Sequence, residues 1–157
     1  MNAAALVEQL AARLIAKGEM LATAESCTGG LLAKLCTDLA GSSAWFERGL
    51  VSYSNASKQA LLGVSLAMLE QNGAVSEVVV QAMALGLLQR APVQHAVAIS
   101  GVAGPGGGSV EKPVGMVCIA WATPDRLRSE TLHFKGDREA IRTLAAVAAL
   151  QGLLLQV

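Results

Sequence analysis

Short apolar runs of strand length alternate in this chain with longer runs of helical periodicity. Leu6, Leu10 and Leu14 recur at the spacing of one helix face, and Gly18 follows as a stop signal. The periodicity predicts, in order, helix 3–17, strand 21–24, helix 31–40, strand 49–53, helix 55–62, helix 77–90, strand 95–100, strand 115–122, strand 127–134 and helix 138–155. Strands that alternate with helices are typical of an α/β protein.

The last two predicted strands follow each other without a helix between them. Residues 115–122 and 127–134 are expected to form a hairpin across Pro124-Asp125, which places an antiparallel pair in the sheet. A chain of 157 residues has the length of one domain. We therefore expect residues 1–157 to form a single-domain three-layer α/β/α sandwich with a mixed, mostly parallel sheet.

Charge and hydropathy exclude two classes of partner. The formal net charge is zero and no run of Lys or Arg occurs, so we expect no nucleic-acid partner. No apolar stretch approaches the roughly 18 residues of a membrane span, and the first residues lack the order of a signal peptide. We expect a cytoplasmic protein without membrane contact. Its apolar content of 53% favours a homo-oligomer, with a dimer as the expected form.

Cysteine and histidine usage bears on metals and disulfides. The three cysteines are odd in number and none belongs to a C-x-x-C pair, which fits a reducing compartment. His95 and His133 lie far apart and neither has ligand spacing from a cysteine. We therefore expect neither a disulfide framework nor a metal site.

A predicted strand-turn-helix corner contains the first candidate nucleophile. Ser26 follows strand 21–24, and in α/β proteins such corners place side chains and free backbone N–H groups at a ligand-binding edge. A serine in this position also serves commonly as a helix cap, and spacing alone does not separate the two roles. Cys27 competes as nucleophile, but a catalytic thiolate needs a cationic neighbour, and a small buried hydrophobe is its better reading.

A second corner follows the strand at 95–100. The glycines of Gly101-Val-Ala-Gly-Pro-Gly-Gly-Gly108 expose successive N–H groups that can hold a phosphate or a ribose. The segment matches neither a dinucleotide-binding fingerprint nor a Walker sequence, so by itself it indicates a nucleotide only weakly.

Four segments in the same order resemble a known family. They are Ala24-Glu-Ser-Cys-Thr-Gly-Gly30, Tyr53-Ser-Asn-Ala-Ser-Lys58, Ile99-Ser-Gly-Val-Ala-Gly-Pro-Gly-Gly-Gly108 and Gly136-Asp-Arg-Glu-Ala-Ile-Arg142. The chain is similar in these segments to the CinA C-terminal domain family, whose enzymes are nicotinamide-nucleotide amidohydrolases. Some members carry a further N-terminal domain, and this chain resembles the stand-alone form.

The resemblance implies a Ser/Lys hydrolase of pyridine-nucleotide salvage. Such an enzyme converts nicotinamide mononucleotide and water to nicotinic acid mononucleotide and ammonia without a metal or cofactor. Ser26 and Lys58 match the catalytic pair of the family, as acylated nucleophile and base. Backbone N–H groups at the turn after Ser26 are the expected oxyanion donors, because a helix start directs unpaired donors and positive potential at a developing alkoxide.

Further residues are assigned to the site on weaker grounds. Tyr53 is expected to relay a proton or to contact the pyridine ring, although an ordinary half-buried tyrosine is about as good a reading. Arg142 lies near the start of an apolar helix and needs an anion, which either the substrate phosphate or neighbouring Asp137 or Glu139 can supply. The remaining expected substrate-binding residues are Thr28, Gly29, Gly30, Ser100, Gly101, Gly104, Gly106 and Gly107.

The position of Lys58 in its predicted helix is unusual. With Asn55 as N-cap, Lys58 becomes the third helical residue, where the positive end of the helix disfavours an ammonium. We therefore expect its pKa to lie below the ordinary value.

A non-catalytic phosphate-binding module, in which Ser26 only hydrogen-bonds the ligand, remains the alternative function. Phosphoryl transfer is the weakest reading, since Glu25 has no second acidic partner near the corners.

Overall fold

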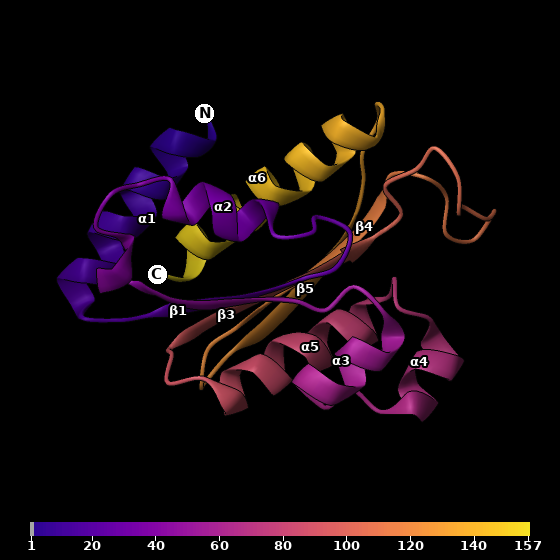
Figure 1. Ribbon diagram of the computed structural model, residues 1–157, viewed down its shortest axis with the longest axis horizontal. Helices are drawn as coiled ribbons and strands as arrows, with labels where there is room; N and C mark the ends of the chain where they lie inside the picture. Colours follow the sequence, from indigo (N-terminus) through magenta and orange to yellow (C-terminus); the bar gives the residue numbers. More distant parts are fainter. Residues whose placement is uncertain (1) are drawn as a thin grey trace.

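The computed structural model describes residues 2–157 and shows a five-stranded sheet between two layers of helices (Figure 1). The strands lie in the order β2-β1-β3-β4-β5. The elements are α1 (Ala3–Lys17), β1 (Leu21–Glu25), α2 (Leu31–Thr37), a 3-10 turn (Ser42–Ala44), β2 (Phe46–Val51), α3 (Asn55–Leu62), α4 (Leu66–Asn72), α5 (Glu77–Arg90), β3 (His95–Gly101), β4 (Met116–Ala122), β5 (Leu127–His133) and α6 (Arg138–Gln156). The expected α/β sandwich with a mixed sheet is confirmed.

Strand direction changes in the middle of the sheet. β1 pairs in parallel with both β2 and β3, whereas β3 with β4 and β4 with β5 are antiparallel. The predicted hairpin therefore supplies the antiparallel half, and the strand-helix alternation supplies the parallel half. Parallel neighbours end at the same edge, so the chain leaves β1, β2 and β3 side by side.

Side chains of successive strand residues point to opposite faces and form two cores. Helices α1, α2 and α6 cover one face, where Leu21 and Ile99 are buried with Leu10 of α1. Helices α3, α4 and α5 cover the other face, where Ala22 and Ala98 are buried against α5. The second face is lined by small residues, which lets α5 approach the sheet closely.

Two elements differ from their predicted boundaries by more than one residue. The helix expected at 31–40 ends at Thr37, whose hydroxyl donates to the carbonyl of Ala33 and so competes with the helical pattern. The strand expected at 49–53 is Phe46–Val51, because pairing with β1 ends at Glu25 opposite Val51.

The helix α4 was missing from the predictions. It has seven residues, and Leu69 is its one fully buried side chain, so its apolar periodicity is weak. Ser65 caps it by accepting a hydrogen bond from the N–H of Met68. Its position matters because the segment after it reaches the site described below.

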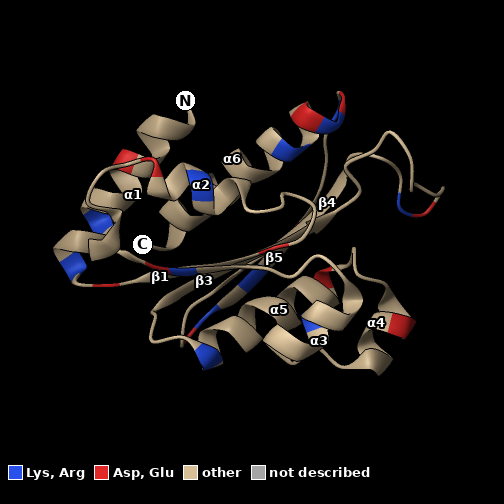
Figure 2. Ribbon diagram, in the orientation of Figure 1, with Lys and Arg blue, Asp and Glu red and all other residues tan. Residues whose placement is uncertain are grey.

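Charged residues occur on the helices of both layers (Figure 2). The helices α1 and α6 carry three each, α5 carries two, and α2, α3 and α4 carry one each. Positive and negative residues are mixed along the chain. Among residues 2–157 no helix combines the length and apolarity required to cross a bilayer.

Candidate active site

Ser26 is the first residue after β1 and lies at the edge where the parallel strands end. Its N–H donates to the carbonyl of Ile99 at 3.0 Å, which ties the start of the turn to β3. Its carbonyl accepts from the N–H of Gly29 at 3.0 Å, which closes the turn. The Ser26 side chain is 8% exposed, so its hydroxyl is nearly removed from bulk water.

Lys58 reaches the Ser26 hydroxyl from α3 on the other side of the sheet edge. Its Nζ lies 3.0 Å from Ser26 Oγ, 2.8 Å from the carbonyl oxygen of Ser52 and 2.9 Å from that of Tyr53. No part of Lys58 is exposed. Burial disfavours the charged ammonium, and it lowers the pKa of Lys58 from its ordinary value.

The three contacts of Lys58 suit a neutral amine. A neutral amine has two N–H bonds and one lone pair, and two carbonyl oxygens can accept only from the N–H bonds. With these N–H bonds on Ser52 and Tyr53, the lone pair is left to accept from the Ser26 hydroxyl, which in the structure donates to the Tyr53 carbonyl at 3.3 Å. The same geometry accommodates the ammonium that forms after proton transfer, because a third N–H then occupies the third direction.

Cys27 is a poor competitor of Ser26. Burial raises the pKa of its thiol to about 11, so the thiolate is scarce near neutral pH. Its side chain is 5% exposed and belongs to the core under α6. Cys27 therefore behaves as a small buried hydrophobe, in agreement with the sequence interpretation.

The start of α2 is occupied by a carboxylate of the protein itself. Glu25 is 1% exposed, and its two oxygens accept hydrogen bonds from the N–H groups of Leu32 at 2.8 Å and Ala33 at 3.0 Å. The Thr28 hydroxyl donates to the same carboxylate at 2.6 Å. The N–H groups of Leu32 and Ala33 are consequently not free for an oxyanion. The donors have to come from the turn before the helix.

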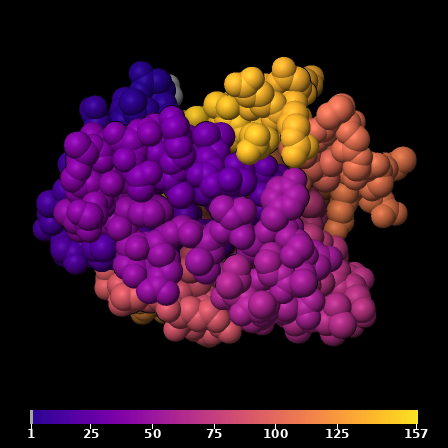
Figure 3. Space-filling view, in the orientation of Figure 1, coloured from indigo at the N-terminus to yellow at the C-terminus, as the bar shows by residue number. Residues whose placement is uncertain are grey.

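The nucleophile and the lysine open into one cavity of about 320 Å³. Its lining comes from five segments of the chain: Ser26, Cys27, Tyr53, Lys58, Ala74, Val75, Ser100–Ala103, Gly104, Gly106, Gly107 and Arg138. In the space-filling view the orange segment that contains the glycine-rich loop stands out beside the yellow start of α6 (Figure 3). The cavity thus lies where the loop after β3 meets the ends of the parallel strands.

A family comparison agrees with this arrangement. Residues 3–157 match the family described as the CinA C-terminal domain. The chain belongs to the CinA C-terminal domain family.

Relatives within this CinA family cover nearly the whole chain. The nicotinamide-nucleotide amidohydrolase PncC of Enterobacter agglomerans is 58% identical over 147 residues, which are 93% of this chain and 90% of the relative. The PncC of Escherichia coli K12 is 54% identical over 155 residues, which are 96% of this chain and 92% of the relative. The crystal structure of competence damage-inducible protein A from Klebsiella pneumoniae superposes with a TM-score of 0.96 at 38% identity, covering 99% of this chain and 97% of the other.

The expected CinA-type site residues separate into two groups in space. Ser26, Lys58, Tyr53, Ser100, Gly101, Gly104, Gly106 and Gly107 all line the cavity. Thr28, Gly29, Gly30 and Arg142 are not among the lining residues. In the second group, Thr28 and Gly29 belong to the turn after Ser26, Gly30 is the N-cap of α2, and Arg142 donates to carbonyls of this turn.

Arg142 donates to two backbone carbonyls and to neither of the two carboxylates considered from sequence. Its Nε donates to the carbonyl of Cys27 and its Nη2 to the carbonyl of Thr28, both at 3.1 Å. Within residues 2–157 it forms no ion pair with Asp137 or Glu139. Two carbonyl dipoles thus take the place of the expected anion.

The cap of α3 also differs from its prediction. Ser54, and not Asn55, is the N-cap, because its hydroxyl oxygen accepts from the N–H of Ser57 at 3.0 Å. Lys58 is therefore the fourth helical residue, and its own N–H donates to the Ser54 carbonyl. The lowered pKa of Lys58 follows from burial and not from a place among the free helix donors.

Sequence reasoning missed two parts of the cavity lining. Arg138 is exposed at the first residue of α6, with Nη1 2.9 Å from the Gly104 carbonyl and Nη2 3.3 Å from the Tyr53 hydroxyl. Its place in the Gly136–Arg142 motif is the sequence feature that could have identified Arg138 as a residue of the site. Ala74 and Val75 form an apolar wall after α4, and no sequence pattern pointed to them.

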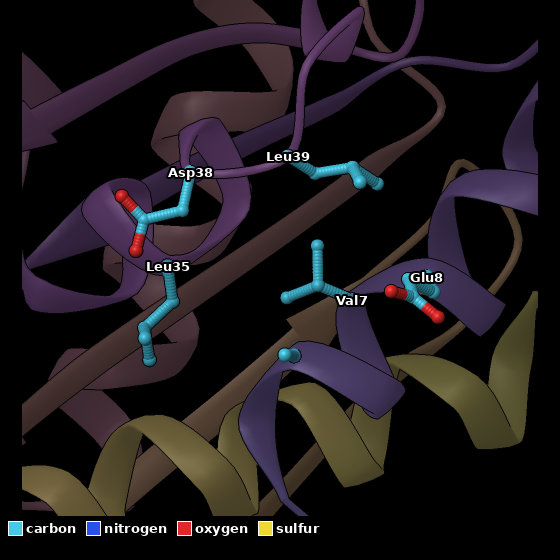
Figure 4. Close-up of a pocket in the computed structure, with 6 residues that line it drawn as sticks. Val7, Glu8, Leu35, Asp38 and Leu39 are labelled. Atoms are coloured by element: carbon cyan, nitrogen blue, oxygen red, sulfur yellow. The ribbon is translucent and has the colours of Figure 1, made fainter.

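A second groove lies far from this chemistry, between α1 and α2 (Figure 4). Val7, Leu35 and Leu39 line it, with Glu8 and Asp38 at its sides. Asp38 already forms an ion pair with Lys34 at 2.7 Å. The groove offers no nucleophile, and the structure does not show what covers it.

Proposed function

We propose that this protein hydrolyses the carboxamide of nicotinamide mononucleotide to nicotinic acid mononucleotide and ammonia. The observation that carries this proposal is the buried Lys58 amine, held by two carbonyl oxygens with its third contact at Ser26 Oγ, 3.0 Å away. The substrate class comes from the relatives named nicotinamide-nucleotide amidohydrolase, which match more than nine-tenths of the chain.

In the first half-reaction Ser26 Oγ attacks the carboxamide carbon, and neutral Lys58 takes the hydroxyl proton. The tetrahedral intermediate carries its negative charge on the former carbonyl oxygen, which needs fixed N–H donors. The Lys58 ammonium then gives its proton to the departing nitrogen as the C–N bond breaks. Ammonia leaves, and the acyl group remains on Ser26.

In the second half-reaction water replaces ammonia. Lys58 takes a proton from the water as it attacks the ester carbon, and it returns that proton to Ser26 Oγ when the C–O bond breaks. Nicotinic acid mononucleotide leaves with a carboxylate. The base and the nucleophile both come from the chain, and the scheme involves no metal or cofactor.

The part of the cavity that is lined by the glycine-rich loop and Arg138 suits the nucleotide phosphate. Arg138 is the one lining arginine, and it lies beside Gly104, Gly106 and Gly107 of the glycine-rich loop. A guanidinium and glycine N–H groups form charge-assisted hydrogen bonds with phosphate oxygens. The apolar wall of Ala74 and Val75 is then available for the pyridine ring. The geometry favours Arg138 over Arg142 as the phosphate ligand.

Ammonia release by the purified protein tests the proposal directly. Nicotinamide mononucleotide should be converted, and Ser26→Ala should lower kcat by at least about 1,000-fold while leaving substrate binding nearly intact. Cys27→Ala is the matched control, because it removes the neighbouring thiol and should retain most activity. Binding of the nucleotide without ammonia release would establish instead the non-catalytic binding module.

We also propose that the protein acts in the cytoplasm as a homo-oligomer. Cys27, Cys36 and Cys118 are all free and buried, as is common in a reducing compartment. Leu66 and Leu155 are 53% and 76% exposed, and they are candidates for contacts between copies. Sedimentation velocity at micromolar concentration would determine the assembly, and a monomer at that concentration would contradict the proposal.

A further inference from the structure

The oxyanion donors must lie in the turn after Ser26, because Glu25 occupies the start of α2. Within residues 2–157, the N–H groups of Ser26, Gly29 and Leu31 donate to backbone carbonyls, whereas those of Cys27, Thr28 and Gly30 do not, and Gly30 lies outside the cavity lining. Cys27 lines the cavity beside Ser26, and Thr28 does not. The Cys27 N–H is therefore the donor of this turn that can serve a substrate carbonyl bound at Ser26.

The direction of the Cys27 N–H depends on the three trans peptides between Ser26 and Gly29. In a trans peptide the C=O and the following N–H point in opposite directions. The Ser26 carbonyl accepts from the Gly29 N–H, so the Cys27 N–H points away from the interior of the turn. The Gly29 N–H belongs to the same peptide as the Thr28 carbonyl. A group that holds the Thr28 carbonyl therefore also fixes the Gly29 N–H and, through its hydrogen bond to the Ser26 carbonyl, the Cys27 N–H.

Arg142 holds that carbonyl together with the Leu31 N–H, which donates to it at 3.0 Å, and Arg142 also holds the carbonyl before it. Its planar guanidinium donates to the carbonyls of Cys27 and Thr28, each at 3.1 Å. A fork of two donors fixes direction more firmly than one point charge. Gly29 has a φ of +60°, and a Cβ there would lie 3.1 Å from Arg142 Nη2. A side chain at position 29 would therefore crowd the Arg142 guanidinium.

We infer that Arg142 is a positioning residue: it orients the Ser26–Gly29 turn so that the Cys27 N–H is held in place as an oxyanion donor. This inference rests on the proposed amidohydrolase function. It replaces the earlier expectation that Arg142 binds the substrate phosphate. Arg142 acts through the backbone and touches no substrate atom in this scheme.

Kinetics on two substrates separate orientation from phosphate binding. Arg142→Met should lower kcat for nicotinamide mononucleotide and for nicotinamide riboside by the same factor, on the order of 10- to 100-fold, with little change in KM. Arg142→Lys should be intermediate, because an ammonium cannot hold two carbonyls as a fork. A rise in KM confined to the mononucleotide would overturn the inference and assign Arg142 to the phosphate.

A matched control separates orientation from general stability. Arg13 also donates its guanidinium to a backbone carbonyl, that of Leu154 at 2.8 Å, near the opposite end of α6 from Arg142. Arg13→Met should leave kcat unchanged per folded molecule, with folding monitored by circular dichroism. Unchanged kcat in folded Arg142→Met would show that its contacts are only structural and would contradict the inference.

Phosphonylation of Ser26 tests the same donors without the natural substrate. A fluorophosphonate reacts with an activated serine by losing fluoride, and negative charge develops on the phosphoryl oxygen. Arg142→Met and Arg142→Lys should slow this labelling, measured by intact mass, in the same order as they lower kcat. Labelling at the wild-type rate would overturn the inference, whereas failure of wild type to release ammonia would overturn the proposed substrate alone.

Discussion

Arg138 donates a hydrogen bond of 3.3 Å to the hydroxyl of Tyr53 across the cavity that Ser26 and Lys58 share. The two residues come from the start of α6 and from the segment between β2 and α3. Tyr53 is 57% exposed, so the contact is open to solvent and easily exchanged for a ligand. Arg138 is the one arginine among the residues that line this cavity.

Removal of this arginine should affect the phosphorylated substrate selectively. We expect Arg138→Met to raise KM for nicotinamide mononucleotide about tenfold, the equivalent of one charge-assisted hydrogen bond of about 1.4 kcal/mol. KM for the riboside should stay within about twofold, because that substrate has no phosphate. Arg126→Met, in the β4–β5 hairpin, is the control. Equal losses on both substrates would remove Arg138 from the phosphate site.

The pH dependence of kcat/KM should report the neutral amine of Lys58. Burial lowers the Lys58 pKa, so activity should rise with pH through an apparent pKa below the ordinary lysine value of about 10.4. Lys58→Arg should lose on the order of 100- to 10,000-fold, since guanidinium does not release its proton near neutral pH.

Lys34→Arg provides the comparison for this prediction. Lys34 is an exposed lysine paired with Asp38, and its replacement should leave the profile unchanged. Activity of Lys58→Arg within a few-fold of wild type would mean that Lys58 is not the base.

Replacement of the buried carboxylate of Glu25 should destabilise the fold. In Glu25→Gln an amide NH₂ faces donors that now meet carboxylate oxygens, and a buried unsatisfied donor costs about 1–3 kcal/mol. For a chain of this length that corresponds to a fall in Tm of about 3–10 °C, measurable by calorimetry. Glu130→Gln, at an exposed glutamate on β5, should change Tm little. A wild-type Tm in Glu25→Gln would show that the turn does not depend on this charge.

The half-buried carboxylate of Glu77, at the start of α5, should make the free energy of unfolding depend on pH. It accepts hydrogen bonds from the hydroxyls of Ser129 at 2.6 Å and Thr131 at 2.8 Å, and these bonds lower its pKa. A lowered folded-state pKa stabilises the protein above the unfolded value of about 4.3, and the effect is lost as pH falls through the folded value.

Glu77→Gln should therefore lower Tm at pH 7 and match wild type near pH 3. Thermal melts by circular dichroism at both pH values measure this difference. If the Tm difference between Glu77→Gln and wild type is the same at both pH values, the hydroxyls of Ser129 and Thr131 do not stabilise the ionised Glu77 more than the neutral acid.

The sequence by itself determined the element order, the mixed sheet and the segments that carry Ser26, Lys58 and the glycine-rich loop. Each of these depends on local information: apolar periodicity, turn residues and the carboxyl ends of parallel strands. The weak helix α4 escaped because its one fully buried residue, Leu69, leaves no periodic pattern.

Only the tertiary structure decided which arginine lines the cavity and which holds the turn. Arg138 and Arg142 lie one helical turn apart on α6, so spacing could not assign them different partners. Their partners, Tyr53 and the carbonyls of Cys27 and Thr28, come from distant segments. The donors to Glu25 are near in sequence, but they meet its carboxylate only because of the direction in which the chain turns from β1 into α2. A hydrogen bond depends on direction in space, which hydrophobic periodicity does not encode.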